Sequence, residues 1–247
     1  MLVRTLTMLE VMGRIRFPAD ESFRSARFFT ADDRLGFSYN ENRVKGGTRL
    51  NVWLKHHWEA NYIISGRGTV TDLTREETWV LEEGMRYVVG PNDKHGLVLT
   101  EDESYMSIFC PPLRGDERFD ADGSYEASGP IEKTDRRMFV KHVDELRRLG
   151  GEERFDNGNV SLVPMLTGED KVGFCLSRTS ISKGSEYRLN PSGKAGVCHV
   201  LSGHGVAVAG DGGEKHQLHN SVAISVDTGD DCRIVAESDL LILNVFS

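Results

Sequence analysis

One acidic residue lies among mainly apolar neighbours. Glu59 begins the stretch Glu59-Ala-Asn-Tyr-Ile-Ile-Ser-Gly-Arg-Gly68, whose β-branched and aromatic residues favour a strand. Because side chains alternate along a strand, Glu59, Asn61 and Ile63 share one face. If that face points into a core, the carboxylate needs a partner, and a metal ion is one such partner. If the face points outward, Glu59 is a solvated residue, and the spacing alone leaves both alternatives open.

The elements that would position Glu59 are mostly short strands. The chain has many glycines (26) and few prolines (7), a composition that suits an all-β protein with many tight turns. Residues 141–149, and their twin near residues 4–12, are the convincing helix-like stretches. Regularly spaced short strands predict a sandwich or a closed barrel. We expect strands at 52–64, 67–72, 78–81, 85–89 and 105–109.

An internal repeat divides the chain. Matching segments recur at a constant separation of 137 residues, and chance matches would scatter over many separations. A period this long indicates duplicated domains rather than a solenoid. We therefore predict domains at 1–129 and 138–247, joined by the polar, Gly-Pro-containing run at 127–134. The matching pairs are 1–4 with 138–141, 36–37 with 173–174, and 63–68 with 200–205.

Composition and charge exclude some classes of protein. The net charge of −8 disfavours nucleic-acid binding, which needs a basic surface. No segment approaches the roughly 18 consecutive apolar residues that span a bilayer, and the first residues lack the pattern of a signal peptide. The four cysteines form no C-x-x-C pair, so we expect reduced thiols and a cytoplasmic protein.

Two motifs resemble those of cupins. The stretch 59–68 has the form E-x-x-Y-x-x-S-G-x-G and resembles the first cupin motif, in which the acidic residue is a metal ligand. Gly84-Met-Arg-Tyr87 and Asp93-Lys-His95 resemble the second motif, in which the histidine is a ligand. The resemblance implies an all-β fold of tandem cupin domains, a bicupin, each domain a double-stranded β-helix or jelly-roll barrel.

Residues 1–129 resemble the ectoine synthase family more closely still. The specific match is Phe109-Cys-Pro-Pro-Leu-Arg-Gly115 followed by Asp120-Ala-Asp-Gly-Ser-Tyr125, a tail that generic cupins lack. The resemblance implies one iron ion per chain, held in the N-terminal domain by Glu59, Tyr87 and His95. Carboxylate, phenolate and imidazole donors suit Fe(II) and would also accept zinc or manganese. Without the resemblance, Tyr87 would be interpreted as a core aromatic residue.

The resemblance also implies a reaction. In the family an amine attacks an acetamide carbonyl of the same molecule, and water leaves to give a cyclic amidine. Arg27 would bind a substrate carboxylate, Glu117 would move the amine proton, and His57 would act in the pocket. Their alternatives are a surface ion pair for Arg27, a solvated carboxylate for Glu117 and a supporting hydrogen-bonding group for His57. Phe109, Pro111 and Pro112 are further pocket residues that match the family.

Other pocket positions depart from the family. Where it has Trp, Thr, Tyr, Asn and His, this chain has Phe23, Asn42, Leu54, Cys110 and Phe119. Leu54 and Phe119 each remove a polar group, and a pocket that loses such a group changes its substrate preference. We therefore expect a small-molecule substrate that differs from, or is less polar than, the substrate of the family.

The second repeat lacks the ligands. Positions 137 residues after Glu59, Tyr87 and His95 hold Gly196, Ile224 and Cys232. We therefore predict a degenerate, metal-free second cupin that pairs with the first as an intramolecular pseudo-dimer. A homodimer of the whole chain is a further assembly to consider.

Three functions compete at this point. The first is an iron-dependent cyclase or dehydratase of ectoine synthase type, a carbon–oxygen lyase, acting on a small acylated diamino-acid-like substrate. The second is an iron cupin oxygenase on a small metabolite, since open metal positions can activate dioxygen. The third is a non-catalytic, metabolite-binding bicupin.

Overall fold

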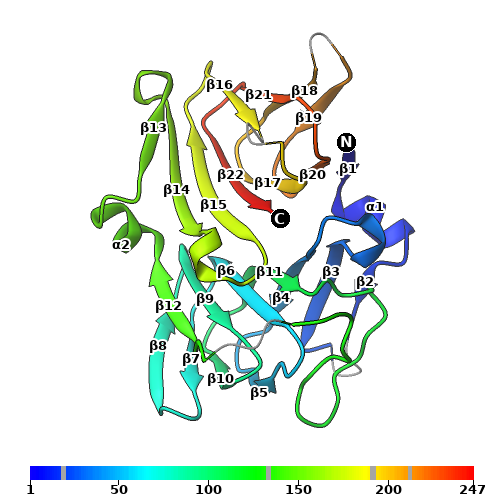
Figure 1. Ribbon diagram of the computed structural model, residues 1–247, viewed down its shortest axis with the longest axis vertical. Helices are drawn as coiled ribbons and strands as arrows, with labels where there is room; N and C mark the ends of the chain where they lie inside the picture. The colour runs from blue at the N-terminus through cyan, green and yellow to red at the C-terminus, as the bar shows by residue number, and fades with distance from the viewer. Residues whose placement is uncertain (18–20, 132–134, 190–192, 211–212) are drawn as a thin grey trace. The chain divides into compact units, whose positions relative to one another are not determined.

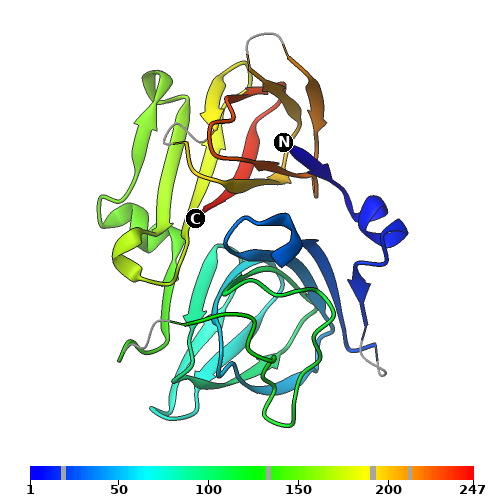
Figure 2. The ribbon, with the colours of Figure 1, turned by 45° about the vertical axis from the view of Figure 1, so that its right-hand side comes forward.

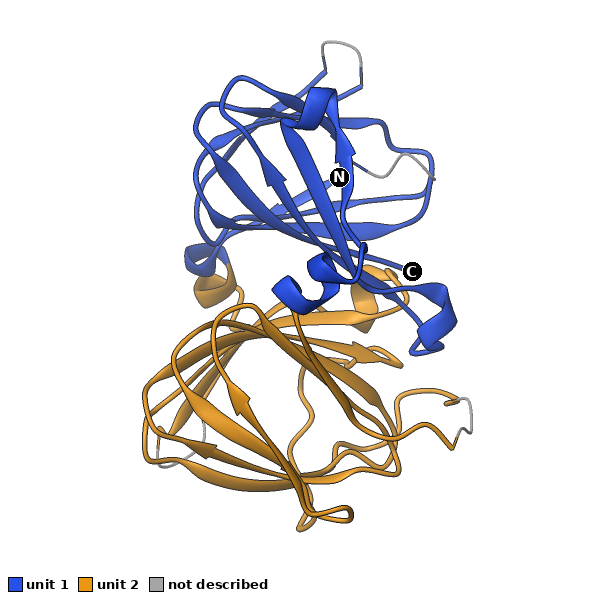
Figure 3. Ribbon diagram, turned by 90° about the vertical axis from the view of Figure 1, so that its left-hand side faces the viewer, with its two compact units in different colours: residues 1–8, 143–247 blue, residues 9–142 orange. Residues whose placement is uncertain are grey.

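The computed structural model describes residues 1–17, 21–131, 135–189, 193–210 and 213–247. The chain is almost all β and divides into two compact units (Figures 1 and 3). One unit is formed by residues 9–142, and the other by residues 1–8 together with 143–247. Part of the predicted linker, residues 132–134, lies outside the described residues.

The unit of residues 9–142, hereafter the first barrel, consists of two antiparallel sheets (Figure 2). The smaller sheet has the order β5 (Arg49–Trp53), β10 (Lys94–Leu99), β7 (Gly68–Asp72) and β8 (Glu77–Leu81). The larger sheet has the order β12 (Phe139–His142), β9 (Met85–Val89), β6 (Trp58–Ser65), β11 (Glu103–Cys110), β4 (Ser38–Val44), β3 (Phe23–Phe29) and β2 (Ile15–Arg16).

The interior of the first barrel is apolar where strand alternation directs side chains inward. Its core includes Ile63, Val70, Leu81 and Val89, one from each of β6, β7, β8 and β9. Such alternation between buried and exposed positions is what antiparallel strands with one core-facing side require. The barrel therefore provides a rigid wall from which polar side chains can project.

The strand predicted over 52–64 is two strands, so that prediction was wrong in its extent. β5 ends at Trp53 in the smaller sheet, and β6 begins at Trp58 in the larger one. Between them the chain turns, and the amide of Lys55 donates to the Ser124 hydroxyl at 3.1 Å. The β-rich composition of 52–64 gave no sign of this change of sheet, because the turn carries neither Gly nor Pro.

The unit of residues 1–8 and 143–247, hereafter the second barrel, repeats this design. Its smaller sheet has the order β16 (Glu186–Leu189), β21 (Cys232–Ala236), β18 (Gly205–Ala209) and β19 (Lys215–Leu218). Its larger sheet has the order β1 (Leu2–Arg4), β20 (Ala223–Val226), β17 (Gly196–Ser202), β22 (Leu240–Phe246), β15 (Cys175–Ile181), β14 (Val160–Leu166) and β13 (Glu153–Phe155).

The two repeats exchange their first strands. β1 belongs by sequence to the first repeat, yet Val3 lies opposite Ile224 in the second barrel. β12 belongs to the second repeat, yet Val140 lies opposite Tyr87 in the first barrel. Both pairings obey the separation of 137 residues, so each barrel is completed by one strand of the other repeat.

The helical elements are short. α1 (Leu6–Val11) and α2 (Val143–Arg148) lie where the sequence predicted helical stretches, and three 3₁₀ turns complete the described elements. Of the helices in the described residues, none combines the length and hydropathy that crossing a lipid bilayer demands. The 3₁₀ turns are η1 (Ala31–Asp33), η2 (Asp156–Gly158) and η3 (Gly168–Asp170).

Candidate metal and substrate site

A cavity lies in the first barrel between its two sheets. It encloses about 710 Å³ of empty space, including its open mouth. Glu59 on β6, Tyr87 on β9 and His95 on β10 all line it, so the three predicted ligands are brought together from both sheets. The other lining residues are Phe23, Ser25, Asn40, Asn42, Val44, Leu50, Asn51, Val52, Leu54, Leu97, Tyr105, Phe109, Phe119, Gly123 and Tyr125.

Glu59 faces this cavity rather than the outer surface. It lies opposite Val89 on one side and Phe109 on the other, in the middle of the larger sheet. Burial raises the pKa of its carboxyl to about 7, and polar contacts with Asn61 and Ser107 oppose this shift. Glu59 is therefore a desolvated acid whose ionised form a nearby cation would stabilise.

His95 and Tyr87 are both buried beside the cavity, with ring centroids 6.2 Å apart. Burial lowers the pKa of His95 to about 4, against a hydrogen bond to the Asp93 carbonyl and the charge of Asp72. The imidazole is thus neutral at physiological pH, which is the form that binds metals. Burial also holds the pKa of Tyr87 well above its usual value, so its phenol would ionise only beside a cation.

This donor set fits a divalent cation chemically. The carboxyl of Glu59 and the phenol of Tyr87 face the same cavity as the neutral imidazole of His95. Burial opposes the ionisation of both the carboxyl and the phenol. Carboxylate, phenolate and imidazole are acceptable to iron, zinc and manganese. The described residues contain no group of three or more His, Cys, Asp and Glu side chains with metal-binding geometry, and the candidate set contains only two residues of those types. Metal binding by Glu59, Tyr87 and His95 stays a prediction.

Five of the predicted substrate-binding residues line the cavity. Phe23, Asn42, Leu54, Phe109 and Phe119 form parts of its wall. Leu54 is fully buried in the core, whereas Phe119 is 44% exposed. These positions make the wall more aromatic and aliphatic than polar.

Arg27 and Glu117 do not line the cavity; they pair with each other. Arg27 Nη1 lies 3.3 Å from Glu117 Oε2, and both side chains are buried. Glu117 also accepts the amide hydrogens of Arg114 and Gly115, the latter at 2.8 Å. In this structure each charge neutralises the other, and Glu117 holds the turn at 114–115. Their predicted roles with substrate stay predictions.

His57 and Cys110 also lie behind the cavity wall. The His57 ring is edge-on to the rings of Phe109 and Tyr125, and its Nε2 lies 3.0 Å from the Ser128 hydroxyl. Burial lowers the pKa of His57 to about 4 and raises that of the Cys110 thiol. His57 is therefore placed to orient the aromatic wall.

A hydrogen-bonded chain behind Glu59 was missed from the sequence. Asn42 Nδ2 donates to the Ser107 hydroxyl at 2.8 Å, and Ser107 donates to the side-chain oxygen of Asn61. Asn61 carried a signal, because it is in phase with Glu59 along the strand. Ser107 carried none, since its place beside β6 depends on the register of β11. Tyr125 was also missed, although it stacks on Phe119 with ring centroids 4.4 Å apart.

The three corresponding positions of the second barrel are closed by packing. Ile224 and Cys232 belong to a continuous apolar core. Gly196 lies against Phe246, and any Cβ at position 196 would collide with that ring and with the Val245 carbonyl. Burial raises the pKa of the Cys232 thiol to about 11, which makes it a poor thiolate donor.

Two barrels of this topology in one chain define the class: the protein is a bicupin, and the predicted fold class is confirmed. The structure is similar along its whole length to solved bicupin-like structures. Ylba from E. coli gives a TM-score of 0.69 at 15% identity, covering 99% of this chain and 90% of that one. Oxalate decarboxylase from Lactobacillus farciminis gives a TM-score of 0.70 at 12% identity, covering 100% of this chain and 86% of that one.

The sequence identifies the family. The sequence model of ectoine synthase matches residues 1–129 and 138–247, so the chain belongs to the ectoine synthase family. L-ectoine synthase of Desulfosudis oleivorans is 37% identical over 127 residues, 51% of this chain and 97% of that protein. L-ectoine synthase of Oceanobacillus iheyensis is 36% identical over 125 residues, which are 51% of this chain and 96% of that protein. The chain is an enzyme of this type, a carbon–oxygen lyase.

Proposed function

We propose that the cavity of the first barrel closes a ring in a small acylated diamino-acid-like substrate by loss of water. One observation carries this proposal: Glu59, Tyr87 and His95 line one cavity, whereas their counterparts in the second barrel are glycine or apolar core. Loss of all three positions together in one repeat, and retention together in the other, is expected of residues that act as a unit. There would then be one active site per chain.

We propose Fe(II) as the resident metal, held by Glu59, Tyr87 and His95, with zinc or manganese as alternatives. When bound, a divalent cation supplies a Lewis acid for the carbonyl under attack. The neutral imidazole of His95 and the desolvated carboxyl of Glu59 support this assignment. A neutral imidazole is the form that binds metals, and a cation would stabilise the ionised carboxylate.

The wall of the cavity would exclude water from the reacting groups. Phe109, Phe119 and Tyr125 form a continuous aromatic contact, and ring closure by dehydration is favoured where water is excluded. Leu54 offers the substrate no hydrogen bond. We therefore propose a substrate with an apolar group where ectoine synthases carry a polar contact.

Arg27 and Glu117 would act in sequence. A substrate carboxylate that replaces Glu117 at the Arg27 guanidinium would form a bidentate pair. The released Glu117 oxygen would then be available to take the proton that the amine loses on attack. The Arg27–Glu117 contact at 3.3 Å supports this order of events, because it holds the two side chains next to each other before substrate enters.

The test is turnover by anaerobically purified, iron-loaded protein. The substrates are N-acetylated diaminobutyrate and homologues with longer or more apolar chains, and the product is detected by mass as the loss of one water. His95→Ala should remove the metal and the activity, whereas His56→Ala, at an exposed neighbour, should retain both. Unchanged metal content in His95→Ala contradicts the metal site, and stoichiometric consumption of dioxygen contradicts cyclodehydration.

We further propose that the joined repeats act as a pseudo-dimer within one cytoplasmic chain. The exchange of β1 and β12 supports this, because each barrel is completed by the other repeat. All four cysteines are free thiols, as is typical of a reducing compartment. A fragment that ends before β12 and yet is stable and active would contradict the pseudo-dimer.

A further inference from the structure

The segment Arg137–His142 completes the first barrel although the repeat places most of it in the second half of the chain. The side chain of Met138 packs into the core of the first barrel with Tyr87 and Leu97. The four residues that follow form β12 and pair with β9. This segment is therefore an integral part of the barrel that carries the candidate site.

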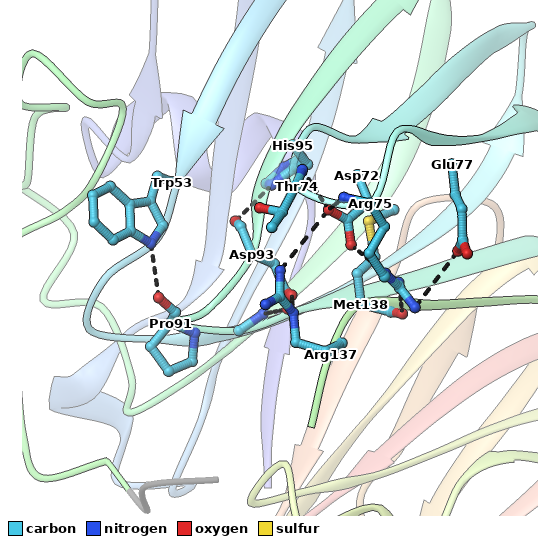
Figure 4. Close-up of polar contacts among 11 residues, drawn as sticks. Trp53, Asp72, Thr74, Arg75, Glu77, Pro91, Asp93, His95, Arg137 and Met138 are labelled. Atoms are coloured by element: carbon cyan, nitrogen blue, oxygen red, sulfur yellow. Dashed lines mark hydrogen bonds and ion pairs between the residues drawn. The ribbon is translucent and has the colours of Figure 1, made fainter. Parts of the chain in front are cut away.

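Polar contacts of Arg137 and Arg75 fasten this segment (Figure 4). Arg137 Nε donates to Asp93 Oδ1 at 3.0 Å, and Arg137 Nη2 lies 3.9 Å from Asp72 Oδ1. In return, Arg75 Nη2 donates to the Met138 carbonyl at 2.7 Å, while its Nε pairs with Asp72 at 2.7 Å. The segment is thus held to the first barrel through the Arg137 side chain and through the Met138 carbonyl.

The carboxylates in this cluster are not surface groups. The side chains of Asp72 and Asp93 are both 0% exposed, and that of Arg137 is 33% exposed. Exposed ion pairs contribute little, but a buried carboxylate that loses its cation is strongly unfavourable. Arg137 therefore constrains Asp93 more than a typical surface arginine would.

Asp93 also stabilises the β9–β10 turn, which leads to His95. Its Oδ2 accepts the amide hydrogen of Gly90 at 2.8 Å, which closes the turn between β9 and β10. Its carbonyl oxygen lies 3.5 Å from His95 Nδ1. On the other side of the same turn, Tyr87 lies opposite Val140 in the ladder. The segment therefore contacts the structural supports of two candidate ligands.

We propose that Arg137 is a positioning residue that ties the segment leading into β12 to the candidate ligands His95 and Tyr87. The inference rests on the metal site proposed above. Arg137 lies between the two segments that match the family, 1–129 and 138–247. Its ion pair with Asp93 therefore comes from a part of the chain that the family model does not match, and it would support the metal site from the segment between the repeats.

The test compares Arg137→Gln with Arg147→Gln in the full-length chain. Arg147 is a matched control, because its side chain is 35% exposed and it pairs with the two carboxylates of Asp144 and Glu152 in the second barrel. Zinc affinity is measured by competition with a chromogenic chelator. Hydrogen–deuterium exchange of residues 85–99 is measured without metal, so that one readout does not depend on metal binding.

We expect Arg137→Gln to weaken zinc binding about 10-fold, as loss of an outer support of a ligand does. We also expect exchange at residues 90–95 to rise at least about threefold, since the turn opens more often. Arg137→Lys retains the charge but not the guanidinium group, so it should show smaller changes in zinc affinity and in exchange. It replaces Arg137→Gln if that variant does not fold. Arg147→Gln should match the parent protein in both.

Three outcomes are decisive. Unchanged zinc affinity and unchanged exchange in Arg137→Gln overturn the inference, as do equal effects in Arg147→Gln. If His95→Ala leaves the zinc affinity of the parent chain unaltered, the proposed metal site fails. The exchange experiment then still decides the role of Arg137: faster exchange at 90–95 supports it as a positioning residue of the turn, and unchanged exchange overturns it.

Discussion

The carboxyl of Glu103, at the start of β11, should make the first barrel less stable as the pH rises. Glu103 is only 3% exposed, and its Oε2 is buried with no hydrogen-bond partner among the described residues. Burial raises its pKa from 4.5 to about 7. At about 1.4 kcal/mol for each tenfold change in proton affinity, ionising Glu103 in the folded state costs about 3 kcal/mol more than in the unfolded chain.

The sign follows from linkage. Below the unfolded-state pKa the carboxyl is neutral in both states and carries no penalty. As the pH rises from about 4.5 to about 7, the unfolded chain loses the proton first, and stability falls. Above pH 7 the folded state carries the full penalty. Glu103→Gln removes this dependence, because the amide does not titrate.

The assay is urea unfolding of the parent and of Glu103→Gln at pH 5 and pH 8, followed by tryptophan fluorescence. All three tryptophans lie in residues 9–142, so the signal reports the first barrel alone. From pH 5 to pH 8, the free energy of unfolding of Glu103→Gln should rise by about 2–3 kcal/mol relative to that of the parent. Glu101→Gln, at an exposed position, should show no such change. A shift below about 1 kcal/mol would refute the reasoning.

Three further predictions address packing and specificity. Gly196→Ala should destabilise the second barrel by about 1–3 kcal/mol in chemical denaturation, because its Cβ meets the Phe246 ring. Gly168→Ala, whose Cβ meets no described atom within 4 Å, should be nearly neutral. Residues 9–142 expressed alone should be more soluble and melt higher than residues 9–129, which lack β12 and the buried Met138; equal behaviour would contradict the role given to that segment. Leu54→Tyr should raise kcat/KM for polar substrates relative to apolar ones, and an unchanged ratio would show that Leu54 does not set specificity.

Local pattern and the repeat predicted most of the fold. Glu59, Asn61 and Ile63 could be assigned to one face from strand alternation alone, and the helices at 6–11 and 143–148 lay where their stretches predicted. The strand predicted at 52–64 shows the limit, because the switch from one sheet to the other depends on the contact of Lys55 with the distant Ser124.

The sequence indicated only those candidate residues that would act directly. The resemblance to the family named Tyr87 and His95 as ligands, which stays a prediction, but it gave no sign of the support of His95. Arg137 is far from Asp93 in sequence, and their contact depends on an exchanged strand whose register is set by non-local pairing. In the same way, the pairing of Arg27 with Glu117 required the fold of the segment after β11.

The exchange of first strands also orders events during synthesis. The first barrel can close once residue 142 has been made, but β1 must wait for β20 at residues 223–226. At about 5–20 residues per second, synthesis from residue 142 to residue 226 takes roughly 4–17 s. During this time the N-terminal residues have no partner strand, and an unpaired strand is a template for intermolecular pairing. Ribosome-bound chaperones and slow translation near residue 226 should therefore affect the yield of this chain more than that of a single cupin.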